Sequence, residues 1–139
     1  MWIAGNSGPF KLHEIEIASS AGKGLRILHI SDLHFAPGQA AKADFLVRLS
    51  ELEPDLVINT GDNLGHKDAI NPALWALEPL RQFPGVFVNG SNDYRAPMPR
   101  NPLRYFIGPS SNSTPGVRLD TKRFEDELIG SGWLNLNNK

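Results

Sequence analysis

Cysteine is absent from the 139-residue sequence. Without a thiol, the chain can form no disulfide bond, no thiolate zinc site and no cysteine nucleophile. No stretch approaches the roughly 18 consecutive apolar residues that a membrane-spanning helix needs. The first residues, "MWIAGNSGPF", also lack the basic and apolar segments of a secretion signal. We therefore expect a soluble, cytoplasmic protein, and membrane attachment of a longer parent protein stays open.

A large excess of charge of one sign is missing as well. The chain has 14 basic and 15 acidic residues, which gives a formal net charge of −1. Such a balance argues against a broad nucleic-acid-binding surface or adsorption to an anionic membrane. With 40% apolar and 21% charged residues, the composition is that of one ordinary globular domain.

Apolar runs alternate with helical patterns through the middle of the chain. The runs Leu25–Ile30, Leu56–Thr60 and Gly85–Asn89 predict short strands that are covered on both faces. Between them, Ala40–Leu52 and a segment from Asn71 to Leu80 have helical spacing. This alternation predicts the α/β class, with a layered, mostly parallel sheet flanked by helices.

The flanking segments are less regular. Strand formers in Phe10–Ile17 predict a further strand with a bulge. In the second helix we expect Asn71 as N-cap, Pro72 in the first turn and Trp75 in the core. The stretch 94–118 holds five of the eleven prolines and predicts a long irregular loop.

The C-terminal part predicts one more helix and the start of a strand. The helix begins at Asp120 or Thr121 and runs to Ile129, with Phe124 and Leu128 inward and Gly130 as its C-terminal cap. The sequence "WLNLNNK" then reads as the beginning of a strand. An unpaired sheet edge there predicts self-association.

Polar side chains follow each of the three predicted central strands, in "HISDLH", "NTGDN" and "NGSND". The carboxyl ends of parallel strands meet at one edge of a sheet, where ligands bind. Asp32, His34, Asp62 and Asn92 are therefore expected to converge. Carboxylate and amide oxygens with one imidazole suit Mn, Fe, Zn or Co. Gly61 and Gly90, beside these residues, allow the backbone to turn tightly.

The motifs D-L-H, G-D-N and G-S-N-D, in this order, resemble the first three motifs of the calcineurin-like metallophosphoesterases. The resemblance implies one half of a β-sandwich flanked by helices and a site in which two divalent metal ions hydrolyse phosphate mono- or diesters. It makes residues 1–139 a partial domain of this family, with the motifs in residues 25–94 and the irregular loop in 94–118.

By this resemblance, Asp32 and His34 bind the first metal ion and Asp62 bridges both ions. The third motif departs from the family's G-N-H-D. Without a gap, Ser91 takes the place of the metal-binding Asn, and Asn92 that of the catalytic His. A shift of one residue makes Asn92 the ligand instead, which we favour because an amide oxygen binds metal better than a neutral hydroxyl. Asp62 and Asn92 are the expected catalytic residues, and the general-acid histidine is absent.

The family's later histidine motifs are absent too. The four histidines are His13, His29, His34 and His66, and none follows position 66. The chain therefore resembles the N-terminal half of the family domain, and we expect it to hold at most one of the two ions. The alternative is a non-catalytic fragment or interaction module with one weak divalent-metal site.

The remaining polar residues have simpler interpretations. His29 is expected in the core, and His13 and His66 at the surface. Asp93 is expected to hold its loop by accepting backbone donors. Asn63 either orients a metal-bound water or caps a turn. Arg95 either clamps a substrate phosphate or is a solvated loop charge.

Overall fold

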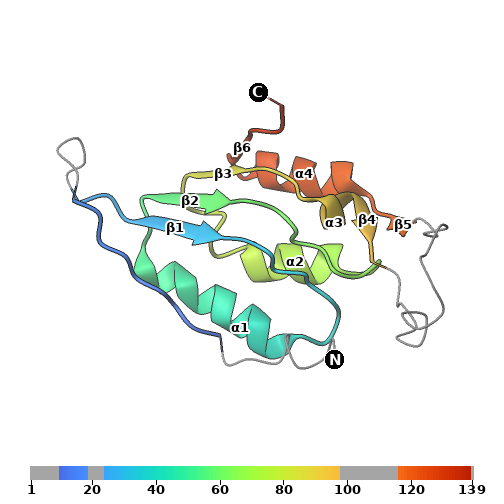
Figure 1. The fold of residues 1–139 in the computed structure, drawn as a ribbon, viewed down its shortest axis with the longest axis horizontal. Coiled ribbons are helices and arrows are strands. Elements are labelled where there is room, and N and C mark those ends of the chain that lie inside the picture. Colours follow the sequence, from blue (N-terminus) through green and yellow to red (C-terminus); the bar gives the residue numbers. More distant parts are fainter. Residues whose placement is uncertain (1–9, 19–23, 98–115, 139) are drawn as a thin grey trace, which may run out of the picture.

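The computed structural model describes residues 10–18, 24–97 and 116–138. Figure 1 shows one main sheet with helices packed against it, and a small ribbon beyond the ends of the strands. None of the helices in the described residues is long and apolar enough to cross a membrane. In chain order the elements are β1 (Ile27–Ile30), α1 (Ala40–Leu49), the 3-10 helix η2 (Ser50–Leu52), β2 (Leu56–Asn59), α2 (Ile70–Leu77), β3 (Gly85–Phe87), α3 (Ser91–Tyr94), β4 (Arg95–Ala96), β5 (Val117–Arg118), α4 (Thr121–Gly130) and β6 (Leu134–Asn135).

The main sheet is parallel throughout. Its strand order is β1-β2-β3-β6, and each pair of neighbours runs in the same direction. Ile30 pairs with Asn59, and Asn59 pairs with Phe87, so the first three strands end at the same level. The predicted α/β class, with a mostly parallel sheet flanked by helices, is confirmed, and the segments after β1, β2 and β3 leave the sheet at one edge.

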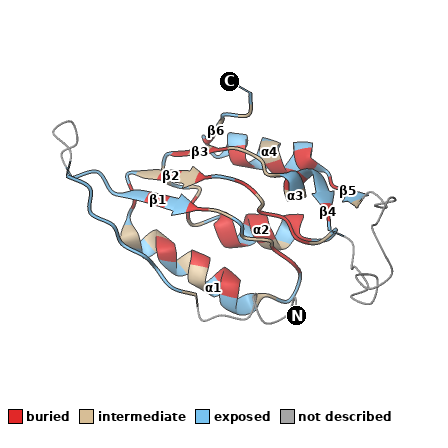
Figure 2. Cartoon of the chain, in the orientation of Figure 1, coloured by how far each residue is buried: buried red, intermediate tan, exposed pale blue. Residues whose placement is uncertain are grey.

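Within the described residues, only one face of the sheet is covered. Leu28, Val57 and Phe87 point toward the helices and are at most 6% exposed. Alternate positions point the other way, and there Ile27 is 52% and Leu134 63% exposed. The expectation of strands covered on both faces is therefore wrong for this part of the chain (Figure 2).

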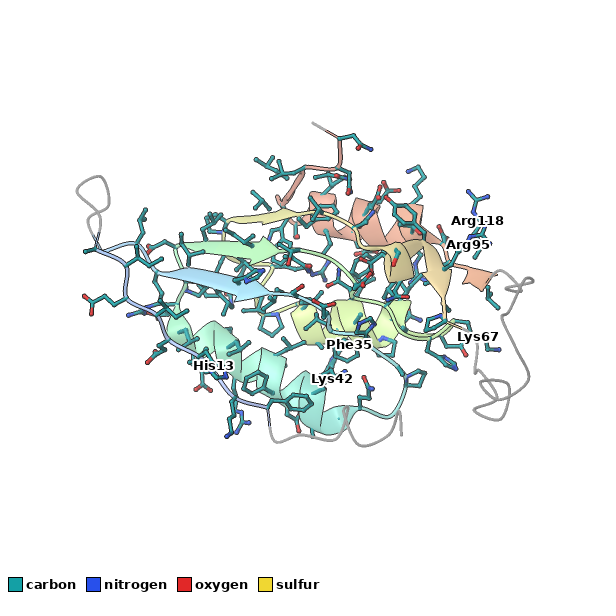
Figure 3. The ribbon with its side chains drawn as sticks, viewed as in Figure 1. His13, Phe35, Lys42, Lys67, Arg95 and Arg118 are labelled. Carbon is teal, nitrogen blue, oxygen red and sulfur yellow. The ribbon has the colours of Figure 1, made fainter. Side chains whose placement is uncertain are left out.

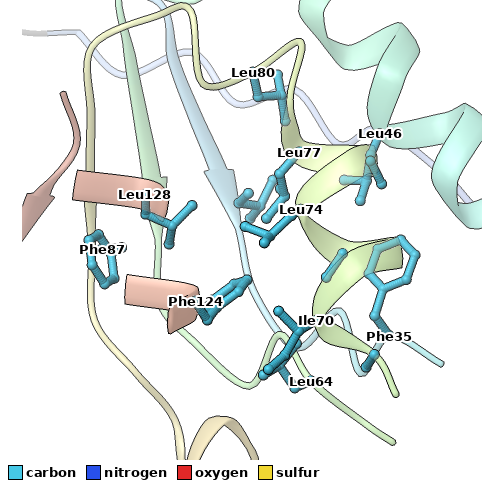
Figure 4. Close-up of a cluster of buried hydrophobic side chains, with 14 of the residues drawn as sticks. Phe35, Leu46, Leu64, Ile70, Leu74, Leu77, Leu80, Phe87, Phe124 and Leu128 are labelled. Carbon is cyan, nitrogen blue, oxygen red and sulfur yellow. The ribbon is translucent and has the colours of Figure 1, made fainter. Parts of the chain in front are cut away.

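The core lies between the sheet and the layer formed by α1, α2 and α4 (Figure 4). Each helix turns apolar side chains inward at helical spacing, as the sequence pattern predicts. The buried apolar residues of these three helices are Ala43, Leu46, Leu49, Ile70, Ala73, Leu74, Ala76, Leu77, Phe124 and Leu128.

The second helix differs from its prediction in two respects. It begins at Ile70 with Ala69 as N-cap, so Asn71 is not the cap. The Asn71 side chain instead accepts a hydrogen bond from Arg123 Nη2 at 2.6 Å, which joins α2 to α4. Trp75 is 59% exposed and not in the core, because it falls on the outer side of a helix that buries Leu74.

The predicted strand at Phe10–Ile17 is wrong. Residues 10–18 form no regular structure, and Ile15 and Ile17 are 82% and 80% exposed. A strand needs a partner for its backbone groups, and no described strand pairs with this segment. The segment contacts α1 through Phe10, whose ring stacks on that of Phe45 with the ring centroids 5.5 Å apart.

The C-terminal elements agree with prediction except at one glycine. Helix α4 is capped by the Asp120 side chain, which accepts from Arg123 N, and it buries Phe124 and Leu128. Gly130 is the last helical residue, and Gly132, at φ +97°, provides the left-handed turn that was expected of Gly130. The predicted C-terminal strand is β6.

The predicted irregular loop of 94–118 lies largely outside the described residues, because positions 98–115 are not described. At its two ends, β4 and β5 pair in antiparallel fashion, with Arg95 opposite Arg118. Leu119 N donates to Tyr94 O at 3.0 Å, so the ribbon continues directly from α3.

A buried carboxylate joins the segments that follow β2 and β3. Asp93 is 0% exposed. Its Oδ1 accepts from the backbone N–H groups of Asn63 and Leu64 at 2.7 and 2.9 Å, and its Oδ2 accepts from Gly90 N at 3.0 Å. The prediction that Asp93 holds its loop through backbone donors is confirmed. Burial raises the pKa of Asp93, although these hydrogen bonds act in the opposite direction.

Replacing this carboxylate should loosen both segments. In Asp93→Asn, an NH₂ group faces backbone donors, so at least one buried N–H loses its acceptor. We expect a loss of about 2–4 kcal/mol in the free energy of unfolding, measured by urea denaturation. The control Asp44→Asn, at an exposed position of α1, should leave the midpoint nearly unchanged. Equal midpoints for the two variants would contradict this role of Asp93.

The uncovered face should promote self-association. Ile27 and Leu134 lie on this exposed face, and apolar surface of this kind tends to pair with another chain. We expect light scattering to detect dimers or larger species, and the double variant Ile27→Glu/Leu134→Glu to shift them toward monomer. Ile129→Glu, at an exposed position of α4, should not. A wild-type chain that stays monomeric at high concentration would refute the expectation.

Candidate metal site

Three segments that leave the sheet edge build the site. Asp32 and His34 follow β1, Asp62 follows β2, and Asn92 lies in α3 after β3. The first two segments run side by side beyond the sheet. Asp32 N donates to Gly61 O at 3.0 Å, and His34 N donates to Asp62 O at 2.9 Å. The backbone therefore places these residues at one edge, as the sequence predicts.

Three of these residues have an unusual backbone conformation. Asp32, His34 and Asp62 have φ angles of 53°, 43° and 54°. Residues with a Cβ rarely adopt left-handed conformations, which cost of order 1–3 kcal/mol each and gather at functional sites. Only two other non-glycine residues of the described chain, Glu53 and Asn138, have positive φ. The strain is therefore concentrated where the polar side chains meet.

The side chains of the three strained residues converge. One ligand atom from each of Asp32, His34 and Asp62 lies within 4.8 Å of the others, a spacing that could hold a metal ion. His34 Nε2 lies 3.7 Å from Asp32 Oδ1, and these side chains are 33% and 67% exposed. Two carboxylates and an imidazole form a donor set that suits a borderline-hard divalent ion.

Asn92 lies next to this group. Its backbone N donates to Asp62 Oδ1 at 2.9 Å, and its side-chain Nδ2 lies 3.4 Å from His34 Nδ1. Asn92 is half-buried, whereas Ser91, the other candidate of the third motif, is exposed. The structure thus brings Asn92 against two of the candidate metal ligands.

Two glycines permit this close assembly. Gly61 has φ +92°, and a Cβ there would lie 2.3 Å from Gly90 N. A Cβ at Gly90 would lie 2.0 Å from Asp62 Oδ1. Any larger residue at either position would push apart the segments after β2 and β3. The tight turn expected at Gly61 is confirmed by its positive φ, whereas Gly90 is extended, with φ −91°, and is required for the close approach to Asp62 instead.

The other histidines lie outside the group. His13 is exposed, as expected. His66 is half-buried and its Nδ1 accepts from Asp68 N at 3.1 Å. His29 is not a core residue, because it alternates with the buried Leu28 and points to the uncovered face, where its Nε2 lies 2.8 Å from Thr60 Oγ1.

Asn63 has a supporting position. It is 0% exposed, its Oδ1 accepts from Asn59 Nδ2 at 2.8 Å, and its Nδ2 donates to Asp93 Oδ2 at 3.2 Å. Both ends of the amide are thus engaged inside the protein. Of the two roles left open by the sequence, this geometry favours fixing the turn.

Two supporting contacts have no signal in the sequence. Ser31 Oγ donates to Asp32 Oδ2 at 2.5 Å, and Lys42 Nζ of α1 donates to Leu33 O, also at 2.5 Å. A lysine in an amphipathic helix ordinarily indicates a solvent-facing position. Lys42 was therefore not among the predicted site residues.

Arg95 lies on β4, three residues after Asn92. Its side chain is exposed, and Nη1 donates to Gly116 O at 3.4 Å. Arg118, its cross-strand partner, is also exposed (Figure 3). Neither guanidinium forms an ion pair with a described acidic residue.

Comparison with known proteins gives one result that covers most of the chain. Searches among curated proteins and among solved structures found no significant match. The model of the calcineurin-like phosphoesterase family, in contrast, matches residues 25–138, which include the whole parallel sheet and the candidate metal site. Membership of that family implies metal-dependent hydrolysis of phosphoesters. The parallel sheet, the motif order and this match lead to one conclusion: the chain belongs to the calcineurin-like phosphoesterase family.

Proposed function

We propose that this chain takes part in the hydrolysis of phosphate mono- or diesters by holding a divalent metal ion with Asp32, His34 and Asp62. The observation that carries the proposal is the combination of left-handed backbone and converging ligand atoms at these residues. Strain at three residues persists only where the surrounding structure enforces it. Glu53 and Asn138 also have positive φ, so what supports a bound ion is that the three strained residues bring their carboxylate and imidazole groups together.

The donor set suits the chemistry of the family. When bound, a divalent ion polarises a phosphoryl oxygen and lowers the pKa of a coordinated water. Asp32 and Asp62 supply two negative charges that oppose the charge of the ion, and His34 supplies a neutral nitrogen. The exposure of Asp32 leaves the group accessible to a substrate from solvent.

A second ion would have fewer ligands in this chain. By resemblance, the first ion uses Asp32, His34, Asp62 and a histidine that the sequence lacks, and the second uses Asp62, Asn92 and two further absent histidines. Three ligands of four remain for the first ion and two of four for the second. Because affinity depends on the number of fixed ligands, we expect weak binding of one ion and almost none of the second.

Asp62 and Asn92 are the residues to which we assign catalytic roles. Asp62 Oδ1 accepts from Asn92 N, which holds this carboxylate while it faces the metal position. Asn92 has no titratable proton at neutral pH, so it cannot act as the general acid. In this account, the leaving group takes its proton from solvent or leaves as an anion.

We assign Arg95 to substrate binding. It is the first residue of β4, three residues after Asn92, and it pairs with Arg118 across the β4–β5 ribbon. Like charges directly opposite each other destabilise a strand pair. An anionic group placed between the two guanidinium groups would relieve this repulsion, as a phosphate does when it accepts hydrogen bonds from arginine.

The histidine count favours a second candidate function, a non-catalytic module with one weak metal site. His34 is the one histidine at the site, and the sequence holds none after His66. Metal binding and hydrolysis distinguish the two functions, since the module would bind an ion without turnover even when the missing histidines are supplied.

Calorimetric titration with Mn²⁺ tests the metal site. We expect at most one binding event, abolished by Asp32→Ala or by His34→Ala, because each removes one of only three ligands. His29→Ala is the matched control, since His29 points to the uncovered face and should leave the binding unchanged. Two tight sites, or binding that survives loss of His34, would mean that other residues hold the ion.

Activity with a chromogenic diester, bis(p-nitrophenyl) phosphate, tests the catalytic part. With Mn²⁺ present, the 139-residue chain should be almost inactive, because one weakly held ion provides only part of the charge stabilisation. An extended version with the later histidine motifs should gain activity that depends on Asp62. Turnover by the short chain at the rate of a complete enzyme would refute the proposed ligand count. An extended version that binds metal but stays inactive would favour the non-catalytic module.

A further inference from the structure

One lysine of α1 is buried. Lys42 is 5% exposed, whereas the other charged residues of the helix, Asp44 and Arg48, are exposed. Lysine is almost never fully buried unless its ammonium group has partners, because removing the charge from water costs several kcal/mol. Desolvation lowers the pKa of Lys42, in agreement with its position.

Two contacts of Lys42 are with the segment that carries the candidate metal ligands Asp32 and His34. Nζ donates to the backbone O of Leu33 at 2.5 Å, and it lies 5.6 Å from the centroid of the Phe35 ring. The first contact is a charge-assisted hydrogen bond and the second has cation–π geometry. Figure 3 shows Lys42 and Phe35 as neighbours at the end of α1 that lies below the site segments.

Leu33 lies between Asp32 and His34, so this contact acts on one particular peptide group. The carbonyl oxygen of that group is Leu33 O, and its N–H is that of His34. Lys42 binds the oxygen, and Asp62 O accepts from the N–H at 2.9 Å. The peptide plane is therefore held from two sides, and the candidate ligands before and after Leu33, Asp32 and His34, both have left-handed φ.

Phe35 extends the same connection to the segment after β2. Its N–H donates to Asn63 O at 2.7 Å, and its carbonyl accepts from Gly65 N at 2.8 Å. Phe35 is 1% exposed, so its ring cannot move without opening the core. Lys42 thus joins α1 to the place where the segments of His34 and Asp62 run side by side.

We propose that Lys42 is a positioning residue of the metal site, which keeps the Leu33–His34 peptide in the orientation that lets Asp32 and His34 bind the same ion. The inference rests on the proposed metal-binding function. Without the ammonium group, the two residues lose one of the restraints that oppose their return to ordinary backbone conformations. Changes in groups that orient ligands typically weaken metal binding by roughly 10–100-fold.

Lys42→Met tests this role, because methionine keeps much of the length and apolar stem of lysine but has no donor. We expect calorimetry to show Mn²⁺ affinity reduced about ten-fold or more. In the metal-free chain, the His34 amide should exchange with deuterium faster than in the wild type, as its peptide plane loosens. Lys42→Arg, which keeps a cationic donor, should recover part of both effects.

Leu46→Ala is the matched control for loss of stability. Leu46 is a buried residue of the same helix whose side chain has no hydrogen-bond donor for Leu33 O, so this variant should lower the melting temperature without changing Mn²⁺ affinity. If Lys42→Met does not fold, two other variants test the positioning role by the same measurements of Mn²⁺ affinity and His34 amide exchange. Lys42→Gln keeps a shorter, neutral donor, and Lys42→Arg keeps a cationic one.

The possible failures can be told apart. Absence of Mn²⁺ binding by the wild-type chain would refute the proposed function, while amide exchange at His34 would still test the restraint. Wild-type binding with unchanged affinity and exchange in the folded Lys42 variants would overturn the positioning role alone. Equal loss of affinity in Leu46→Ala and Lys42→Met would also overturn it, because the effect would then follow general stability.

Discussion

The candidate metal site depends on one buried carboxylate. Asp93 accepts backbone hydrogen bonds from the segments that follow β2 and β3, and it thereby keeps Asp62 and Asn92 side by side. Its burial is unfavourable for the charge, as the raised pKa indicates. Several donors offset this cost only when both segments are in place. The placement of Asp62 and Asn92 is therefore coupled to the stability of the fold. Loosening either segment would leave the Asp93 charge and several backbone N–H groups without partners.

The strained ligands need this rigidity. Left-handed conformations at Asp32, His34 and Asp62 would relax if their segments moved. Opposing restraints come from the hydrogen bonds between the two segments, from the contact of Gly90 with Asp62, and from the Lys42 ammonium. The restraining groups lie at or near the core, whereas the Asp32 side chain is largely exposed. The site thus combines a restrained backbone with candidate metal ligands that are open to solvent.

The sequence predicts those features of the site that follow from motifs at the strand ends. It does not predict those that depend on which surfaces pack together in the fold. The strand ends carry their motifs in order, and parallel strands end at one edge, so the grouping of Asp32, His34 and Asp62 is accessible from the sequence. The role of Asp93 is accessible too, because an aspartate in the turn after a strand readily accepts hydrogen bonds from backbone N–H groups. The outward side of Trp75, the exposure of His29 and the missing strand at residues 10–18 depend on which surfaces pack against them. The role of Lys42 is the feature least accessible from the sequence, because only the folded chain brings Leu33 O next to Lys42 of α1.

Exposure has opposite effects on binding and on reaction at this site. An ion held by these three residues at a solvent-facing edge would keep open coordination positions, and catalytic metal sites need such positions for water and substrate. The same openness would leave water to fill the remaining coordination positions, which would weaken retention of the ion. Rigid placement of the three side chains would partly offset this loss, because they would not need to reorganise when the ion binds. On the proposed function, Asp32, His34 and Asp62 decide whether an ion binds, and the groups that hold their segments, among them Asp93, Gly90 and Lys42, adjust how tightly it binds.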